Sequence, residues 1–395
     1  MAKTIIKEVN DRQTTADFVK IPHLIYEGCA QYVPDMDSDI RSLIGSGADR
    51  RPFVRLQPFV AYQTNSRGRE VPVGRVVGII NERANDRWHT HDARFSLIEF
   101  IDDADVSRAL LEAVERWGAR YGMTTLQGPM GISDFDKEGM LVEDFQLRGS
   151  MTAIYNHEYY PRHLQQLGFT KEVDWLQIRV NIPPTVPARY ARVAQYCREQ
   201  MQLRVVNLTK REIRRPQTRD RIFGLLNESY KDIFGFSKLS EQQAADFVSK
   251  YIPLIDMRLV PVVKNGEDEI VGIAITMISL AEALQRAGGR LWPAGWFHLL
   301  RSLKWKHEDN AEMLLIAVRP DLQGLGVNAL FFDSLIPVYN QMGIRWAETG
   351  PQLEHNVREL TQWKPLKPEY VKRRRCFTKK IEQQEILKTN TDKEK

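Results

Sequence analysis

The residues best suited to bind a chemical group lie in one stretch, Leu314 to Phe332. Its apolar start, Leu314 to Val318, is typical of a buried strand. The chain then passes Pro320, Gly324 and Gly326 and enters a helix. A strand that leads through a glycine turn into a helix presents free backbone N–H groups and the positive end of the helix dipole to one small volume. We therefore predict a phosphate cradle in which one or more residues have a positive φ angle.

The spacing of the glycines excludes one familiar phosphate loop and leaves another open. A P-loop needs Lys and then Ser or Thr after its last glycine, and neither follows Gly326. A dinucleotide-binding fingerprint needs a third glycine where Ala329 stands, although Ala is sometimes accepted there. No repeated strand–helix–strand series surrounds the turn, so the dinucleotide interpretation is less favoured. An ordinary glycine turn without a ligand is the remaining alternative.

The turn also resembles the acetyl-CoA loop of the GNAT acyltransferase superfamily, in which Arg or Gln precedes two residues, Gly, one residue, and Gly or Ala. Gln323 and Gly326 match this pattern and Gly324 is a common filler, whereas Asn328 departs from it. The resemblance implies an α/β (α+β) fold with mixed, mostly antiparallel sheets flanked by helices. It also implies acetyl-CoA or another acyl-CoA as cosubstrate, and a small-molecule or peptide amine as acceptor.

The resemblance further implies where the cosubstrate binds. Its pantetheine arm would lie beside a strand that splays from its neighbour, with its phosphates on the glycine turn. The cofactor-binding residues are then expected to be Ile316, Ala317, Val318, Gln323, Gly324, Leu325, Gly326, Val327, Asn328 and Asn356. No metal is expected to take part.

Direct attack of an amine on a thioester requires a base, a group that polarises the carbonyl, and an acid for the departing thiolate. The backbone N–H of Val318 is expected to polarise the carbonyl. Glu348 and Glu354 are the candidate bases. Each also has a structural interpretation, as an ion-paired strand carboxylate for Glu348 and as a helix-start carboxylate for Glu354.

The acid is the weakest part of the predicted site. Trp363 and Phe377 stand where a tyrosine is found in many enzymes of the superfamily. Tyr339 and Tyr370 are the candidates that remain, and neither has support from its position. A non-catalytic acyl-CoA-binding module, and a tandem-GNAT aminoacyl or peptidyl transferase, are therefore alternatives to an N-acyltransferase.

The composition is that of a globular protein with room for two cores, at 395 residues with 43% hydrophobic and 27% charged residues. A net charge of +5 suits anionic ligands, but nucleic-acid binding is not expected. Three dispersed cysteines predict neither disulfides nor a cysteine-based zinc site, and the pair His89 and His91 is interpreted as surface. No apolar run reaches about 18 residues, so we expect a cytoplasmic protein without stable membrane insertion. A homodimer is left open.

The order of the expected strands and helices indicates the same topology twice. Residues 1-182 form the first domain. Its turn from Ile101 to Asp105 corresponds in the topology to the glycine turn at Gly324, but it has no glycine and three carboxylates. Because carboxylates would repel phosphates there, we expect a degenerate domain without a cofactor site, although a cationic ligand is an alternative. A proline-rich linker and helix, 183-202, precede the domain with the acyl-CoA loop, 203-381. A disordered tail, 382-395, is expected.

An insertion from Ile278 to Lys306 separates two strands of the second domain and contains three tryptophans flanked by basic residues. Packing against the first domain is the favoured interpretation. An apolar flap over a substrate channel and contact with a membrane interface are the alternatives.

Overall fold

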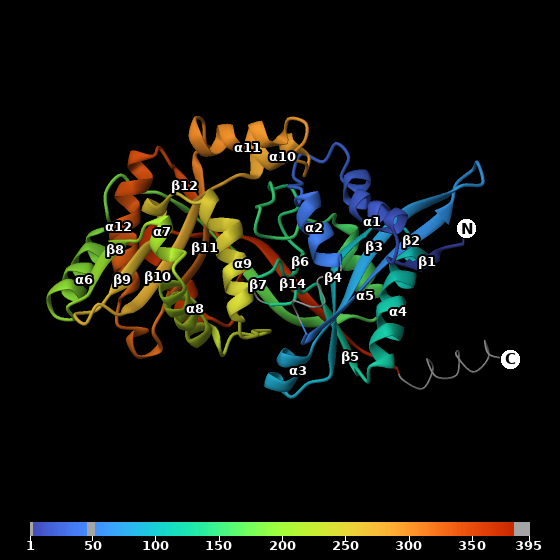
Figure 1. The fold of residues 1–395 in the computed structure, drawn as a ribbon, viewed down its shortest axis with the longest axis horizontal. Helices are drawn as coiled ribbons and strands as arrows, with labels where there is room; N and C mark the ends of the chain where they lie inside the picture. Colours follow the sequence, from blue (N-terminus) through green and yellow to red (C-terminus); the bar gives the residue numbers. More distant parts are fainter. Residues whose placement is uncertain (1–2, 46–51, 134, 383–395) are drawn as a thin grey trace. The chain divides into compact units, whose positions relative to one another are not determined.

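The computed structural model describes residues 3–45, 52–133 and 135–382 (Figure 1). Residues 383–395 of the predicted tail lie outside this range. Contacts divide the chain into two compact units. Unit 1 holds residues up to Trp175, the segment Ala283–Trp296 and the segment from Lys372 onward, and unit 2 holds Leu176–Glu282 and Phe297–Val371.

The unit boundaries differ from the predicted domain boundaries. The chain enters unit 2 within strand β7 (Thr170–Asn181) and returns to unit 1 within strand β14 (Glu369–Lys380). The last residues of β7 pair with β12 (Trp346–Thr349) of unit 2, and the last residues of β14 pair with β5 (Thr125–Gly128) of unit 1. The prolines after residue 182 mark the end of β7. The unit boundary lies earlier, within β7, because its last residues are hydrogen-bonded to β12 of unit 2.

Unit 1 is a mixed sheet covered by helices on both faces. Its strands lie in the order β1 (Ile5–Glu8), β2 (Val54–Thr64), β3 (Glu70–Asn81), β4 (Asp92–Phe100), β5 and β14. Its helices are α1 (Arg12–Ile25), α2 (Asp37–Ile44), α3 (Glu82–Trp88), α4 (Ala104–Arg120) and α5 (Tyr159–Gln166), and the two-residue strand β6 (Met140–Leu141) pairs with β14. Phe59 shares a core with Leu110 of α4, while its neighbour Val60 shares another with Phe18 of α1. Because successive strand side chains alternate, α1 and α4 cover opposite faces.

Unit 2 repeats this arrangement. Its strands lie in the order β7, β12, β11 (Asn310–Val318), β10 (Ile270–Ile278), β9 (Pro261–Lys264) and β8 (Arg204–Asn207). Its helices are α6 (Ala188–Glu199), α7 (Lys210–Ile213), α8 (Pro216–Tyr230), α9 (Glu241–Tyr251), α12 (Asn328–Gln341) and α13 (Val357–Gln362). Helix α12 packs along α6, and α8 lies against β10 and β11. Helices α10 (Ala281–Ala287) and α11 (Gly295–Lys304) belong to the insertion, and β13 (Gln352–Leu353) pairs with β7.

Each unit contains one parallel strand pair among antiparallel neighbours, β4 with β5 and β11 with β12. The predicted fold class, mixed and mostly antiparallel sheets flanked by helices, is therefore confirmed. This repetition also allows each functional position in one unit to be compared with its counterpart in the other.

Helix α1 contains a proline, Pro22, in its interior, where proline ordinarily kinks or breaks a helix. Helix α1 continues through Pro22 to Ile25 and begins after Asp11, whose side chain accepts the backbone N–H of Thr14. Proline removes the N–H that would bond the carbonyl four residues earlier, here that of Phe18. The guanidinium of Arg75 on β3 donates to this carbonyl instead, at 3.1 Å. The helix tolerates the proline because a buried arginine replaces the lost donor.

Candidate functional site

Strand β11 is paired along one edge and open along part of the other. It pairs with β10 from Ala311 to Val318, but with β12 only from Asn310 to Met313. The last bond on the β12 side joins the N–H of Gly350 to the carbonyl of Met313, at 2.9 Å. Among the described residues, no strand pairs with this edge from Leu314 to Val318. The predicted splay is present at this position.

Two residues of β11 direct their backbone groups to this open edge. The N–H of Arg319 bonds the carbonyl of Val271 on β10, and backbone groups alternate between edges along a strand. The N–H and carbonyl groups of Ile316 and Val318 therefore point away from β10. Both carbonyls accept hydroxyls from the end of α8, Tyr230 to Ile316 and Ser229 to Val318, each at 3.0 Å. Neither N–H has a hydrogen-bond partner within the part of the chain that the structure describes.

The turn after β11 has the predicted backbone geometry. Gly324 and Gly326 have φ angles of +80° and +89°, so the prediction of a positive φ is confirmed. A Cβ at Gly326 would lie 2.5 Å from Cγ1 of Val193, whereas one at Gly324 would meet nothing within 4 Å. Four N–H groups have no acceptor among the described residues, those of Gly324, Gly326, Val327 and Asn328. Such a set of unsatisfied donors at a helix start fits a phosphate.

Helix α13 lies beside the start of α12, because Asn328 donates to the side chain of Gln362 at 2.5 Å. Two polar atoms here, Nε2 of Gln362 and Nε1 of Trp363, are buried and have no hydrogen-bond partner among the residues that the structure describes. Both are N–H donors, so a ligand with carbonyl or phosphate oxygens would satisfy them. Asn356, predicted to bind the cosubstrate, uses its side-chain oxygen to cap α13 through the N–H of Glu359, at 3.3 Å. Burial raises the pKa of Glu359 to about 7.

Two buried carboxylates face each other where β11 and β12 begin to separate. Glu348 on β12 is 3% exposed and is opposite Glu312 on β11, which is equally buried. Glu348 accepts from Arg179 at 3.1 Å and from Gln177 at 3.2 Å, and Glu312 accepts from Ser279 at 3.1 Å. The sequence analysis missed Glu312. Its signal was a single glutamate inside an otherwise apolar strand, which is costly to bury without a purpose.

The remaining predicted catalytic residues lie elsewhere in unit 2. Glu354 follows β13 and pairs with the imidazole of its neighbour His355 at 3.5 Å. Tyr339 is fully buried in the core, whereas Tyr370 is 52% exposed. Tyr230 is the tyrosine whose hydroxyl lies on the open edge of β11, and the sequence analysis missed it.

The corresponding strand edge in unit 1 is closed by side chains. Strand β4 pairs with β5 only from Asp92 to Arg94, and the N–H of Ile101 bonds the carbonyl of Val73 on β3. Phe100 is thus the counterpart of Val318. Its N–H donates to the hydroxyl of Tyr160 at 3.1 Å, and its carbonyl accepts the hydroxyl of Tyr159 at 2.5 Å. In the turn that follows, Asp103 caps α4 in place of a glycine cradle.

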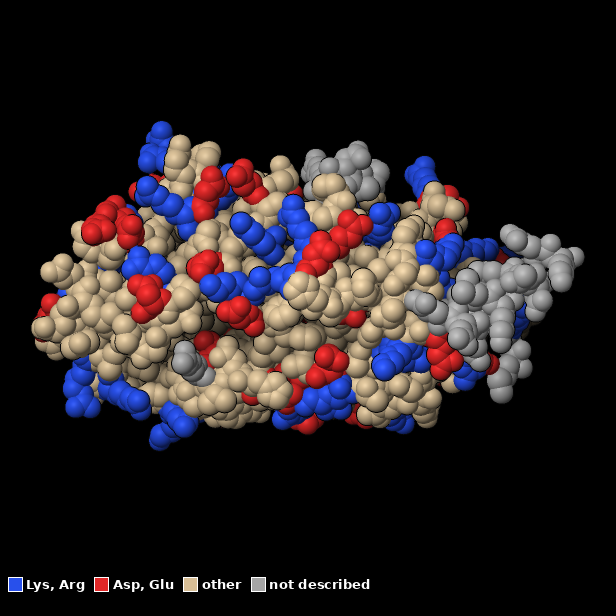
Figure 2. Space-filling model, turned by 90° about the horizontal axis from the view of Figure 1, so that it is seen from below, with Lys and Arg blue, Asp and Glu red and all other residues tan. Residues whose placement is uncertain are grey.

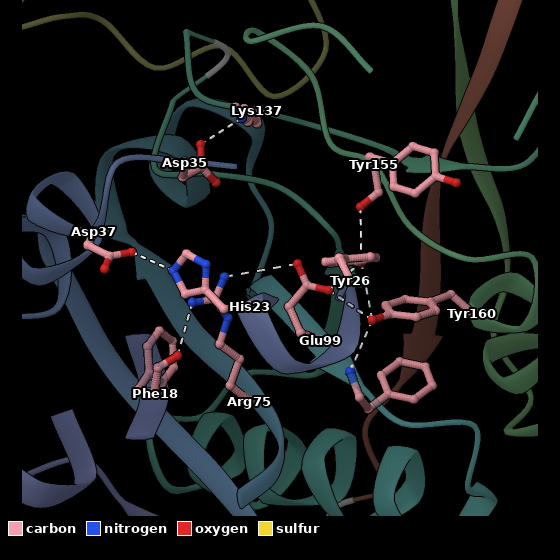
Figure 3. A network of polar contacts seen from close by, with 11 residues as sticks. Phe18, His23, Tyr26, Asp35, Asp37, Arg75, Glu99, Lys137, Tyr155 and Tyr160 are labelled. Carbon is pink, nitrogen blue, oxygen red and sulfur yellow. Dashed lines mark hydrogen bonds and ion pairs between the residues drawn. The ribbon is translucent and has the colours of Figure 1, made fainter. Parts of the chain in front are cut away.

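A buried polar network lies behind this closed edge (Figure 3). Glu99 on β4 accepts the hydroxyls of Tyr26 at 2.5 Å and Tyr160 at 2.8 Å, and it lies 4.0 Å from Arg75. Burial raises the pKa of Glu99 to about 7, although Arg75 and the two hydroxyls favour the carboxylate. Of the two tyrosines that close the edge, Tyr160 is thus held from within by Glu99.

Replacing Glu99 with glutamine should change how the stability of the fold depends on pH. The folded pKa is above the unfolded value of 4.5, so the folded state holds more protons between those values and its stability falls as pH rises toward 7. Glutamine stays neutral and keeps an oxygen for the two tyrosines. Between pH 4 and pH 8, the free energy of unfolding of the Glu99→Gln variant should therefore gain about 3 kcal/mol relative to the wild type. Urea unfolding at both pH values measures this, and a constant difference would contradict it.

Comparisons with known proteins agree with this geometry. No protein-family model matches the chain. It is 23% identical over 373 residues to protein YghO of Escherichia coli, 92% of each chain, and 25% identical over 233 residues to the bacterial ceramide synthase of Caulobacter vibrioides, 59% of each chain. A tandem GNAT protein from the clavulanic acid biosynthesis pathway superposes with a TM-score of 0.53 at 13% identity, over 96% of this chain and 99% of that one. This chain has the tandem GNAT fold. The fold resemblance inferred from the glycine turn is thereby confirmed.

Across the described residues, no three His, Cys, Asp or Glu side chains are arranged to hold a metal ion, and no helix is long and apolar enough to cross a membrane. On the face shown in Figure 2, acidic and basic side chains are interspersed. Part of the positive charge of strand β14 is neutralised by the buried Asp174, which forms ion pairs with Arg375 at 2.8 Å and Arg373 at 3.3 Å.

Proposed function

We propose that this protein is an acyl-CoA-dependent N-acyltransferase with one cosubstrate site, in unit 2. The observation that carries the proposal is the open edge of β11, which leads directly into a turn with four unsatisfied N–H groups. The pantetheine arm contains amides that can add to a strand edge, and its phosphates match the donors of the turn. The buried donors of Gln362 and Trp363 beside the turn support the same ligand.

The closed edge of β4 supports a single site per chain. In unit 1 the N–H of Phe100 is already bonded to the hydroxyl of Tyr160, whereas its counterpart, the N–H of Val318, has no partner among the described residues. Phosphates in unit 1 would also meet Asp103. We therefore propose that unit 1 retains the fold without the cosubstrate. This extends the prediction of a degenerate first domain.

The open edge supports the following chemistry. A cosubstrate with its phosphates on the turn extends along β11 past Val318 toward Ile316, and either N–H can polarise the thioester carbonyl. The amine attacks the carbonyl carbon, the C–S bond breaks, and the nitrogen must lose one proton. Glu312 and Glu348 form the carboxylate pair at the end of the open edge, and we propose that this pair accepts that proton.

Tyr230 is our candidate for the acid. Its hydroxyl bonds the carbonyl of Ile316 at the open edge, where the thiolate of CoA would depart. Tyr230→Phe should lower kcat about 10- to 100-fold, because a proton donor is lost, and should leave the KM for acyl-CoA within threefold. The matched control is Ser229→Ala, which removes the neighbouring hydroxyl from the same edge and should leave kcat nearly unchanged. Equal effects of both variants on kcat would contradict the assignment.

The acceptor we propose is a long-chain amino alcohol. The Caulobacter relative is named a ceramide synthase, and a ceramide is the N-acyl amide of such an amine, so this name supports the proposed class of acceptor. We propose that the reaction takes place in the cytoplasm, which would fit the use of acyl-CoA as cosubstrate. We expect release of free CoA thiol from palmitoyl-CoA with sphinganine, and less with spermidine or a lysine peptide. Thiol release limited to short amines would contradict the acceptor class, and cosubstrate binding without thiol release across all amines would support a non-catalytic module.

A further inference from the structure

Helix α11 and its flanking turns expose aromatic side chains. The segment Leu291–Trp305 contains four large aromatic residues that are well exposed, Trp292 at 80%, Trp296 at 46%, Phe297 at 44% and Trp305 at 68%. The favoured interpretation of this insertion, packing against the first domain, is confirmed for Ala283–Trp296, which belongs to unit 1, where Gln285 donates to the carbonyls of Ala30 and Tyr32. It does not account for these four exposed side chains. An isolated exposed aromatic residue is ordinary, but four within fifteen residues indicate a surface that contacts something apolar.

Helix α11 half-buries its leucines but exposes its two aromatic residues. Gly295 and Ser302, two turns apart, are buried, whereas Trp296 and Phe297 point outward. A helix that only covered a core would bury its largest apolar residues. Trp296 is held in its outward position, because its indole N–H donates to the carbonyl of Pro293 at 3.1 Å. The exposed rings thus belong to an ordered helix.

The positive charge of the same segment indicates an anionic partner. Residues 290–306 contain four basic residues and no acidic ones. Lys304 and Lys306, next to Trp305, are exposed. Tryptophan rings with adjacent lysines suit the boundary between lipid headgroups and acyl chains, and the lysines suit anionic headgroups. At ten residues, α11 is far too short to span a bilayer but long enough to lie in its surface.

We propose that the segment 290–306, the aromatic segment, binds the surface of an anionic membrane. Trp292, Trp296, Phe297 and Trp305 enter the headgroup region, and Lys304 and Lys306 contact lipid phosphates. This inference goes beyond the acyl transfer reaction and does not depend on it. A binding surface of this kind would give the protein access to amines and acyl chains that reside in lipid.

Sedimentation with vesicles tests the proposal on the full chain. We expect the wild type to bind vesicles of 70% phosphatidylcholine and 30% phosphatidylglycerol, and to bind pure phosphatidylcholine at least tenfold more weakly. The double variant Trp292→Ser and Trp305→Ser should lose most of this binding. Both residues are exposed, so far-UV circular dichroism should be unchanged. Lys304→Glu with Lys306→Glu should weaken binding at least tenfold through charge alone.

The matched control is Trp88→Ser, which removes a tryptophan that is 38% exposed on α3, outside the aromatic segment. It should leave vesicle binding unchanged. Failure of the wild type to sediment with anionic vesicles would overturn the proposal, as would undiminished binding by both double variants. Because the readout is lipid binding, a failure here is distinct from a failure of the proposed acyl transfer.

Discussion

Replacing Gly324 with aspartate should abolish measurable binding of acyl-CoA while leaving the protein folded. A side chain at this position meets nothing within 4 Å, and aspartate is among the residues that tolerate a positive φ angle. Its carboxylate would stand among the free N–H groups of the turn, where it would bind the donors itself and repel phosphates. We expect the Kd measured by calorimetry to rise at least 100-fold.

The matched control for this variant is Gly324→Asn. Asparagine has nearly the same shape and the same tolerance of positive φ, but no charge. It should weaken binding about tenfold or less, and the two variants should unfold at similar temperatures. An equal loss of affinity in both variants would mean that the side chain blocks the turn by its size and would contradict the electrostatic account of the cradle.

Replacing Glu312 with glutamine should have the largest effect on the rate of acyl transfer. We expect kcat to fall about 10²- to 10⁴-fold, because glutamine has nearly the same volume but cannot accept the proton of the amine. Binding of acyl-CoA should change less than threefold, since Glu312 is remote along β11 from the glycine turn. Single-turnover measurement of thiol release separates these two quantities.

Glu348→Gln distinguishes the two members of the carboxylate pair. If the pair acts as one unit, this variant should be slowed to a similar degree; if Glu348 only holds Arg179, the rate should change little. The exposed Glu241 on α9 provides the control, since Glu241→Gln should leave kcat unchanged. A normal kcat in both Glu312→Gln and Glu348→Gln would contradict the proposed base.

The features that could be predicted from sequence are those that a short stretch determines by itself. The strand, glycine turn and helix from Leu314 to Phe332 were predictable because a continuous apolar run, two glycines and an apolar helix start lie next to each other in the chain. The polar turn at Asp103 was predictable for the same reason, since a capping aspartate acts on its own helix.

The features that were missed depend on residues far apart in the chain. Tyr230 lies 86 positions before Ile316, so no local pattern connects its hydroxyl to the open edge. Arg75, on the distant strand β3, supplies the hydrogen-bond donor that the helix loses at Pro22. Helix propensities describe only neighbouring residues, so they could not predict this donor. The burial of Glu312 depends on its pairing with β12, and the exposure of Trp292 depends on the position of the whole insertion.

The central claim is that acyl-CoA binds once per chain, on the open edge of β11 and the turn after it. Hydrogen–deuterium exchange of the full chain, with and without saturating palmitoyl-CoA, tests both the number and the location of sites. We predict slower exchange over residues 314–328 and no change over residues 95–105, where Tyr159 and Tyr160 already occupy the corresponding edge. Protection over residues 95–105, or none over residues 314–328, would contradict the claim.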